Sequence, residues 1–115
     1  MMQTGVSLYG GFAGGETQRS DARYKPNIAI MDAANGRGAG TSAGQVIMGA
    51  DDARLDGFVV KNGKASGVTL VLKKAGGMDN AGVSPTGRHC TFRNNCVDVL
   101  AGAIINSNSL AIVDR

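Results

Sequence analysis

Short runs of alternating apolar and polar residues recur along the chain, and one of them occurs twice. Residues 55–63 read LDGFVVKNG, and residues 87–95 read GRHCTFRNN. Each copy contains two apolar residues spaced by two positions. These pairs are Phe58 with Val60 and Cys90 with Phe92. Because residues with this spacing point to the same face of a β-strand, both copies predict a short strand with one buried face.

The residues around each apolar pair predict how the chain bends. A basic residue and then Asn-Gly or Asn-Asn follow the pairs, at 62–63 and 94–95, and these dipeptides are typical of turns. The position before each pair holds Gly57 or His89, and a third partial copy at 111–115 aligns Asp114 with them. Gly, His and Asp tolerate left-handed backbone geometry better than most residues. We therefore expect a bend at this position in every repeat.

Other strands are predicted on both sides of these copies. Residues 76–80 (GGMDN) and 102–106 (GAIIN) share a pattern, and their spacing of about 25 residues suits one coil of a repeat protein. Residues 6–9 and 27–30 each carry an apolar pair that points one way, and Val46 begins a further strand with Ile47. The two apolar pairs are Val6 with Leu8 and Ile28 with Ile30.

Short strands, evenly spaced turns and a fixed repeat length together predict a solenoid of stacked coils. Residues 10–26 and 33–44 are glycine-rich or charged and predict loops, and no window has helical periodicity over ten or more residues. A β-sandwich is the alternative fold, but its antiparallel hairpins need tight turns between partner strands. Here the strands recur in one orientation with the same flanking residues, which favours stacking.

The composition fits an architecture with little room for large side chains. The 115 residues, one domain at most, include 18 Gly, three Phe, two Tyr and no Trp. Small residues let backbone layers approach closely. The net charge of +3 comes from scattered basic residues rather than a stripe with interleaved aromatics, so we expect neither nucleic-acid binding nor a membrane-surface role. No stretch approaches the ~20 apolar residues of a membrane span, and the first residues lack the features of a signal peptide.

Two cysteines, Cys90 and Cys96, leave the redox compartment open. They could form a disulfide, although the residues favour two buried free thiols. His89 beside Cys90 fits no zinc-binding spacing, because a zinc site needs further ligands.

Several blocks of the chain, in this order and spacing, resemble large bacterial right-handed β-helix surface proteins of the pectate-lyase-like and polymorphic outer-membrane-protein-repeat type. The blocks are residues 6–17 (VSLYGGFAGGET) with Arg19 and Asp21, residues 55–58 (LDGF), residues 76–80 (GGMDN), residues 84–86 (SPT) and residues 90–95 (CTFRNN).

The resemblance implies an all-β fold, a right-handed parallel β-helix of about three to four coils. We expect one partial domain over 1–115, with a first coil and long loops in 1–45 and repeated coils in 46–115. In the family the block around Tyr9 follows earlier coils and a secretion signal, and Arg115 falls where an inward apolar residue belongs. The expectation is therefore a fragment of a larger protein at the bacterial outer membrane, on the cell surface or outside the cell.

No set of residues predicts a catalytic, cofactor-binding or metal site. Asp51 and Asp52, near Arg54 and Asp56, form the best acidic cluster, but adjacent strand residues face opposite ways, so a solvated turn is favoured over a Ca²⁺ site. Asp79 lies in a glycine-rich stretch without the repeating GGxGxD calcium motif.

Other motifs are equally weak. The glycines of 10–15 lack the residues that complete a nucleotide-binding loop. Cys90 could be a nucleophile beside His89, but its alignment with Phe58 favours a core thiol. Tyr9 and Phe12 could stack on a sugar ring, although a core or cap position is favoured. The residues kept as candidates for facing a ligand are Tyr9, Phe12, Asp51, Asp52 and Asp79.

Three functional hypotheses follow. The leading one is a structural or adhesive module of a surface or secreted protein, with glycans or surface proteins as partners, no cofactor and no enzymatic activity. The alternative is a fragment of a pectate-lyase-like polysaccharide lyase or glycoside hydrolase, which would call for Ca²⁺. The third is a fragment without a function of its own, since three or four coils are close to the minimum for a stable solenoid.

Overall fold

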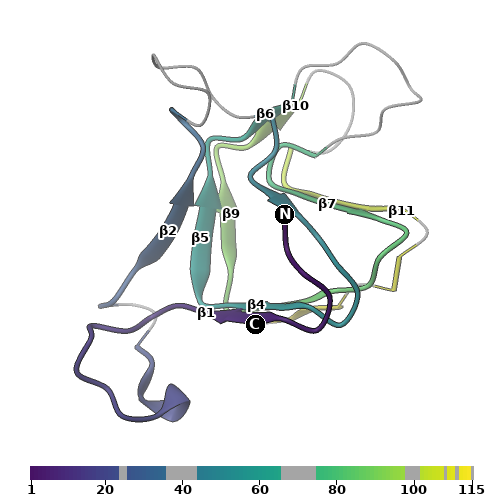
Figure 1. Cartoon of the computed structure of the whole chain (residues 1–115). Helices are drawn as coiled ribbons and strands as arrows, with labels where there is room; N and C mark the ends of the chain where they lie inside the picture. The colour runs from purple at the N-terminus through teal and green to yellow at the C-terminus, as the bar shows by residue number, and fades with distance from the viewer. Residues whose placement is uncertain are drawn as a thin grey trace.

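The computed structural model describes residues 1–23, 26–35, 44–65, 75–97, 102–107, 109–110 and 112–114. Within them the chain forms twelve short strands and one 3-10 turn, Arg19–Asp21 (Figure 1). The fold is mostly β, and every strand pair is parallel. The expected absence of long helices agrees with the described residues.

The strands lie in four parallel sheets, named here by their first strand. The β1 sheet contains β1 (Ser7–Tyr9), β4 (Arg54–Asp56), β8 (Thr86–Arg88) and β12 (Ile112–Asp114). The β2 sheet contains β2 (Ala29–Asp32), β5 (Phe58–Lys61) and β9 (Thr91–Arg93). The β3 sheet contains β3 (Ile47–Met48), β7 (Met78–Ala81) and β11 (Ile104–Ser107), and the β6 sheet pairs β6 (Lys64–Ala65) with β10 (Cys96–Val97).

The repeats found in the sequence are the strands that pair. Leu55 lies opposite Gly87, and Val60 lies opposite Phe92, as the alignment of 55–63 with 87–95 predicts. Met78 lies opposite Ile104, as the second pattern predicts. Side-chain periodicity in a strand is two residues, so this register keeps each apolar set on the same face of its sheet. Both alignments are confirmed.

The backbone bends are also where the repeats predict them. Gly57 and His89 have φ of 83° and 47°. Asn62 and Asn94, in the turns after the strands, have φ of 61° and 53°. Such positive values are uncommon outside Gly, and His and Asn are among the residues that tolerate them best. The corners of successive repeats therefore share one conformation.

The alignment of the third copy is wrong by one residue. Asp114 lies opposite Arg88, not at the position of His89, and Val113 lies opposite Gly87. In this register Val113 continues the line of Leu8, Leu55 and Gly87 along the β1 sheet. Ala111 and Arg115, the other ends of that copy, lie outside the described residues.

The first-half strands form, with one shift of face. The second strand spans Ala29–Asp32 rather than 27–30. Ile28 and Ile30 share a face as predicted, but they are 59% and 47% exposed, whereas Met31 packs against the core opposite Val60. The apolar pair in this strand therefore points outward, and a methionine that the pattern did not single out points inward.

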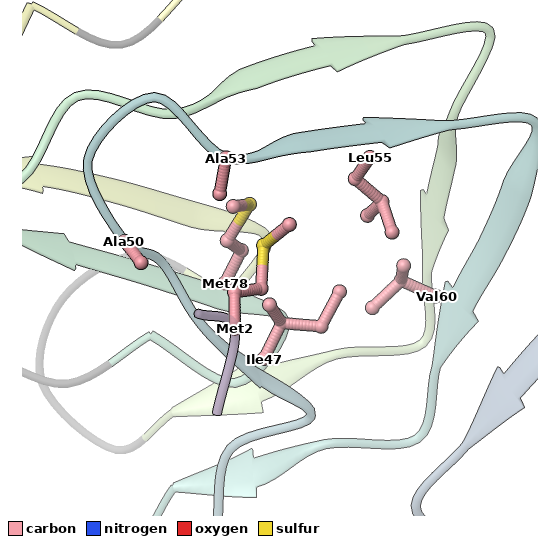
Figure 2. Close-up of a cluster of buried hydrophobic side chains, with 7 residues drawn as sticks. All are labelled: Met2, Ile47, Ala50, Ala53, Leu55, Val60 and Met78. Carbon is pink, nitrogen blue, oxygen red and sulfur yellow. The ribbon is translucent and has the colours of Figure 1, made fainter. Parts of the chain in front are cut away.

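One compact core lies between strands of the β1, β2 and β3 sheets (Figure 2). Leu55 and Val60 are fully buried at its centre. The buried cluster consists of Met2, Ile47, Ala50, Ala53, Leu55, Val60 and Met78. Four of these seven residues are Ala or Met, with small or flexible side chains, which agrees with a chain that is poor in aromatics and rich in glycine.

The interior also contains a buried amide side chain, that of Asn80, which bonds to the next repeat. Asn80 is only 1% exposed, and its Nδ2 donates a hydrogen bond of 2.8 Å to Oδ1 of Asn106 in the next repeat. On its other side Asn80 fills the space beside Gly49, where a Cβ atom would collide with the amide oxygen. The Asn that ends both GGMDN and GAIIN is thus a stacking residue.

Replacing Leu55 by Ala should destabilise the fold by about 2–5 kcal/mol, because it removes a fully buried side chain and leaves a cavity. Leu8 lies directly opposite Leu55 in the β1 sheet but is 39% exposed, so Leu8→Ala should cost less than about 2 kcal/mol. Urea unfolding of both variants measures the difference. Equal losses would mean that the core does not centre on Leu55.

Replacing Gly63 by Ala should cost about 1–3 kcal/mol, because the added Cβ would collide with the backbone carbonyl of Gly76. Gly15→Ala is the matched control, since no atom lies within 4 Å of its Cβ position. Thermal unfolding should leave the control within about 0.5 kcal/mol of the parent. A neutral Gly63→Ala would show that these two backbone segments do not approach so closely.

Candidate functional site

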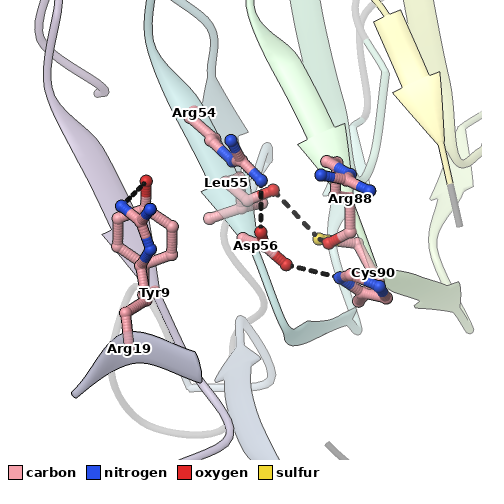
Figure 3. A network of polar contacts seen from close by, with 8 residues as sticks. Tyr9, Arg19, Arg54, Leu55, Asp56, Arg88 and Cys90 are labelled. Carbon is pink, nitrogen blue, oxygen red and sulfur yellow. Dashed lines mark hydrogen bonds and ion pairs between the residues drawn. The ribbon is translucent and has the colours of Figure 1, made fainter. Parts of the chain in front are cut away.

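A buried carboxylate lies on the outer face of the β1 sheet. Leu55 points into the core, so its strand neighbours Arg54 and Asp56 point to the opposite face. The Asp56 side chain is nevertheless only 5% exposed. It is covered by Arg54, whose Nη2 lies 2.8 Å from Oδ2, and by His89, whose Nδ1 lies 2.7 Å from Oδ1 (Figure 3). Two repeats therefore meet at this one side chain.

The surroundings of Asp56 favour its ionised form. Burial by itself raises the pKa of this carboxyl, but the hydrogen bonds from His89 and Arg54 and their charges outweigh it and hold the pKa below its ordinary value. Since the ionised carboxylate can only accept, Nδ1 of His89 is the donor in this pair. The bond thereby fixes the orientation of the His89 ring at the corner between β8 and β9.

Cationic side chains also surround Tyr9, the residue of β1 that lies opposite Asp56. The guanidinium of Arg19 lies 4.7 Å from the centre of the Tyr9 ring, and that of Arg54 lies 5.6 Å from it. Nη1 of Arg19 also donates a 3.0 Å hydrogen bond to the phenol oxygen (Figure 3). Arg88 lies opposite Asp56 on the other side. We call Tyr9, Arg19, Arg54, Asp56, Arg88 and His89 the polar cluster.

Cys90 lies at the edge of the polar cluster as a protonated thiol. Its Sγ lies 3.0 Å from the carbonyl oxygen of Arg88 and 3.5 Å from that of Leu55, both of which can only accept. Burial is the main cause that raises the pKa of this thiol, and the nearby carboxylate of Asp56 acts in the same direction. A nucleophilic thiolate is disfavoured by this environment, and the expectation of a core thiol agrees with the contact of Cys90 with the core.

Both cysteines are free thiols, but they are not both buried. Cys96 is exposed at the start of β10, so the expectation of a buried thiol is wrong for this residue. Among the described strands β10 pairs with β6, and Cys96 lies opposite the exposed Lys64. Cys96 and Lys64 therefore lie on the solvent-exposed face of the β6 sheet.

A groove of about 640 Å³ lies next to the polar cluster. Its apolar surface includes Ile28 and Ala29 at the start of β2 and Phe58 and Val59 at the start of β5. Its polar side chains include Arg23, from the loop before β2, and His89. Because His89 belongs both to the groove and to the polar cluster, Asp56 positions one of the lining residues of the groove.

The five residues predicted to face a ligand are not brought together. Tyr9 is half-buried within the polar cluster, and Phe12 is 37% exposed in the loop that follows β1. Asp51 and Asp52 form an exposed turn before β4. Asp79 belongs to β7 of the β3 sheet. Four separate segments thus hold these candidates.

The acidic candidates have local structural partners. Oδ1 of Asp51 accepts a 2.8 Å hydrogen bond from the backbone N–H of Ser84, and Asp52 has a positive φ of 53° that closes the turn. This agrees with the expected solvated turn. Oδ2 of Asp79 accepts a 2.8 Å hydrogen bond from Nε2 of Gln45. Among the described residues there is no group of three or more His, Cys, Asp or Glu placed to hold a metal ion.

The residues that sequence reasoning missed are Arg54 and His89 as partners of Asp56. A signal for His89 existed, because the alignment of 55–63 with 87–95 places Asp56 opposite Arg88, the residue directly before His89. The left-handed bend at His89 turns its side chain toward the neighbouring repeat, and that consequence is not visible in a linear alignment.

Comparisons with known proteins identify no relative: no protein-family model, curated protein or solved structure matches this chain. In the part of the chain that the structure describes, no helix has the length and apolar character needed to cross a membrane.

The polar cluster predicts how stability depends on pH. A carboxyl whose pKa is lower in the folded state stabilises the fold above its unfolded pKa of about 3.9, and this contribution is lost as the pH falls through the lower folded pKa. Asp56→Asn should therefore destabilise the protein by about 1–3 kcal/mol at pH 7, and the loss should shrink below about pH 4. Urea unfolding of both proteins between pH 7 and pH 2.5 measures it.

Asp52→Asn is the control for this experiment, because it removes an exposed carboxylate from the preceding turn and keeps a residue that tolerates positive φ. A loss at Asp56→Asn that is the same at every pH would contradict the ionised pair.

Proposed function

We propose that this chain is a stretch of right-handed parallel β-helix and serves as a structural or adhesive module of a bacterial cell-surface or secreted protein. Support for the coil comes from the order of the strands. The chain passes through the β1, β2 and β3 sheets in that order in three successive repeats, and each sheet is parallel. Parallel strands joined by crossover connections are right-handed in about 98% of cases. The sequence blocks that resemble bacterial β-helix surface proteins point the same way.

The observation that carries an adhesive role is the outer face of the β1 sheet. Neighbouring parallel strands lie about 4.8 Å apart, so Tyr9, Asp56 and Arg88 form a row of polar side chains along the stack. Arg54 and Arg19 flank that row. The exposed guanidinium of Arg19 at the side of this row is suited to hydrogen-bond the hydroxyl groups of a glycan chain, because a guanidinium presents several N–H donors in a fixed fork and only one of them is needed for the bond to Tyr9.

Polysaccharide cleavage has less support than adhesion. Catalysis or Ca²⁺ binding by Asp56 would need its carboxylate to be available, and Arg54 and His89 both bind it. The proposed module therefore acts by contact with glycans or with other surface proteins, outside the cell or at the outer membrane.

The test is binding of the purified chain to a panel of immobilised bacterial and host glycans. Arg19→Ala should weaken binding about threefold or more, because Arg19 is exposed beside the row of polar residues. Lys64→Ala removes an equally exposed cation from β6 in a different sheet and should leave binding unchanged. Absence of binding to the whole panel, or equal losses in both variants, would count against an adhesive role of this face.

A further inference from the structure

The groove beside the polar cluster has the size and chemistry of a small-molecule site. The residues proposed above to contact glycans, such as Arg19, are not among its lining residues. Its volume of about 640 Å³ lies within the range of ligand pockets in proteins, about 300–1,000 Å³. Its walls come from three separate segments: the loop that contains Arg23 with the start of β2, the corner that precedes β5, and the corner that precedes β9. The two corners contain the residues with left-handed backbone geometry, Gly57 before β5 and His89 before β9.

The floor of the groove favours an apolar body. Ile28, the residue directly before β2, is a large apolar residue of the lining and is 59% exposed. Phe58, Val59 and Ala29 are further apolar residues of the lining. A sugar would place hydroxyl groups against these side chains without hydrogen-bond partners, which is unfavourable. A ring or a short alkyl chain would bury the same surface at no such cost.

The charge at the rim favours an anion. The described lining residues include the cationic Arg23 and the titratable His89. They include neither Asp nor Glu. Nη1 of Arg23 lies 3.3 Å and 3.5 Å from the carbonyl oxygens of Ala22 and Asp21, so its own loop holds the guanidinium in place. The nearest buried carboxylate, Asp56, is already bound by Arg54 and His89.

We propose that this groove binds a small organic carboxylate whose body is an aromatic ring or a short alkyl chain. The apolar body lies on Ile28 and Val59, and the carboxylate lies at the rim, where Arg23 provides a charge-assisted hydrogen bond. His89, oriented by Asp56, borders the same end of the groove.

Three probes with one body and different heads test this proposal: 4-phenylbutyrate, 4-phenylbutyramide and 4-phenylbutylamine, titrated into the intact chain and followed by calorimetry and amide chemical shifts. The carboxylate should bind with a dissociation constant of about 1 mM or lower. It should bind about fivefold more tightly than the amide, because fivefold in affinity is the most that an exposed ion pair usually contributes. The amine should bind most weakly. Shifts should centre on Ile28, Val59 and Thr91.

Two variants of one strand locate the site. Ile28→Asp places a negative charge on the groove and should weaken binding of the carboxylate at least tenfold. Ile30→Asp changes another exposed residue, which pairs with Val59 but is not itself among the lining residues, and should weaken binding clearly less. Arg23→Gln should reduce the preference for the carboxylate over the amide to less than twofold. Circular dichroism checks that each variant is folded.

The proposal is overturned if none of the three probes binds, or if the amide binds as tightly as the carboxylate. It is also overturned if Ile28→Asp and Ile30→Asp weaken binding equally. None of these outcomes bears on glycan binding by Arg19, so failure here leaves the adhesive role to its own test.

Discussion

Parallel, in-register pairing between successive repeats is the constraint on which the rest of this structure depends. Leu55 lies opposite Leu8 and Gly87 in this register. Leu55 therefore points to the core, and its neighbours in β4, Arg54 and Asp56, point to the outer face. A slip of one residue would bury Arg54 and Asp56 and expose Leu55. The core, the buried amide of Asn80 and the polar cluster are consequences of the same register, and none could form without it.

The polar cluster shows how such a register can place unlike residues in contact. Asp56 and His89 are far apart in the sequence, and they meet because β4 and β8 are neighbours and because the chain bends at His89. The result is a carboxylate that is buried on the solvent side of a sheet, with two partners that keep it ionised. The groove is a further product of this corner, since His89 is shared by both.

The strands could be predicted well because the repeats are in the sequence itself. Phe58 and Val60 aligned with Cys90 and Phe92, and the same residues pair in space. The errors arose where the pattern was too short to set the register, as at Asp114, or where two apolar sets competed for one face. At β2 the sequence pattern showed the pair Ile28 and Ile30, but these residues are exposed, and Met31 is the residue that packs against the core. The site could not be predicted in the same way, because it depends on side-chain contacts across repeats and on loop residues such as Arg23.

The packing of Asn80 against Gly49 has an evolutionary consequence. The amide occupies the space that any side chain at position 49 would fill, and it also bonds to Asn106 in the following repeat. The residues at positions 49, 80 and 106 therefore constrain one another, although many residues separate them in the chain. A lineage that gains bulk at position 49 has to lose the amide at 80, and Asn106 then loses its partner. Related chains should accordingly differ by whole stacked columns of residues, more than by scattered single changes.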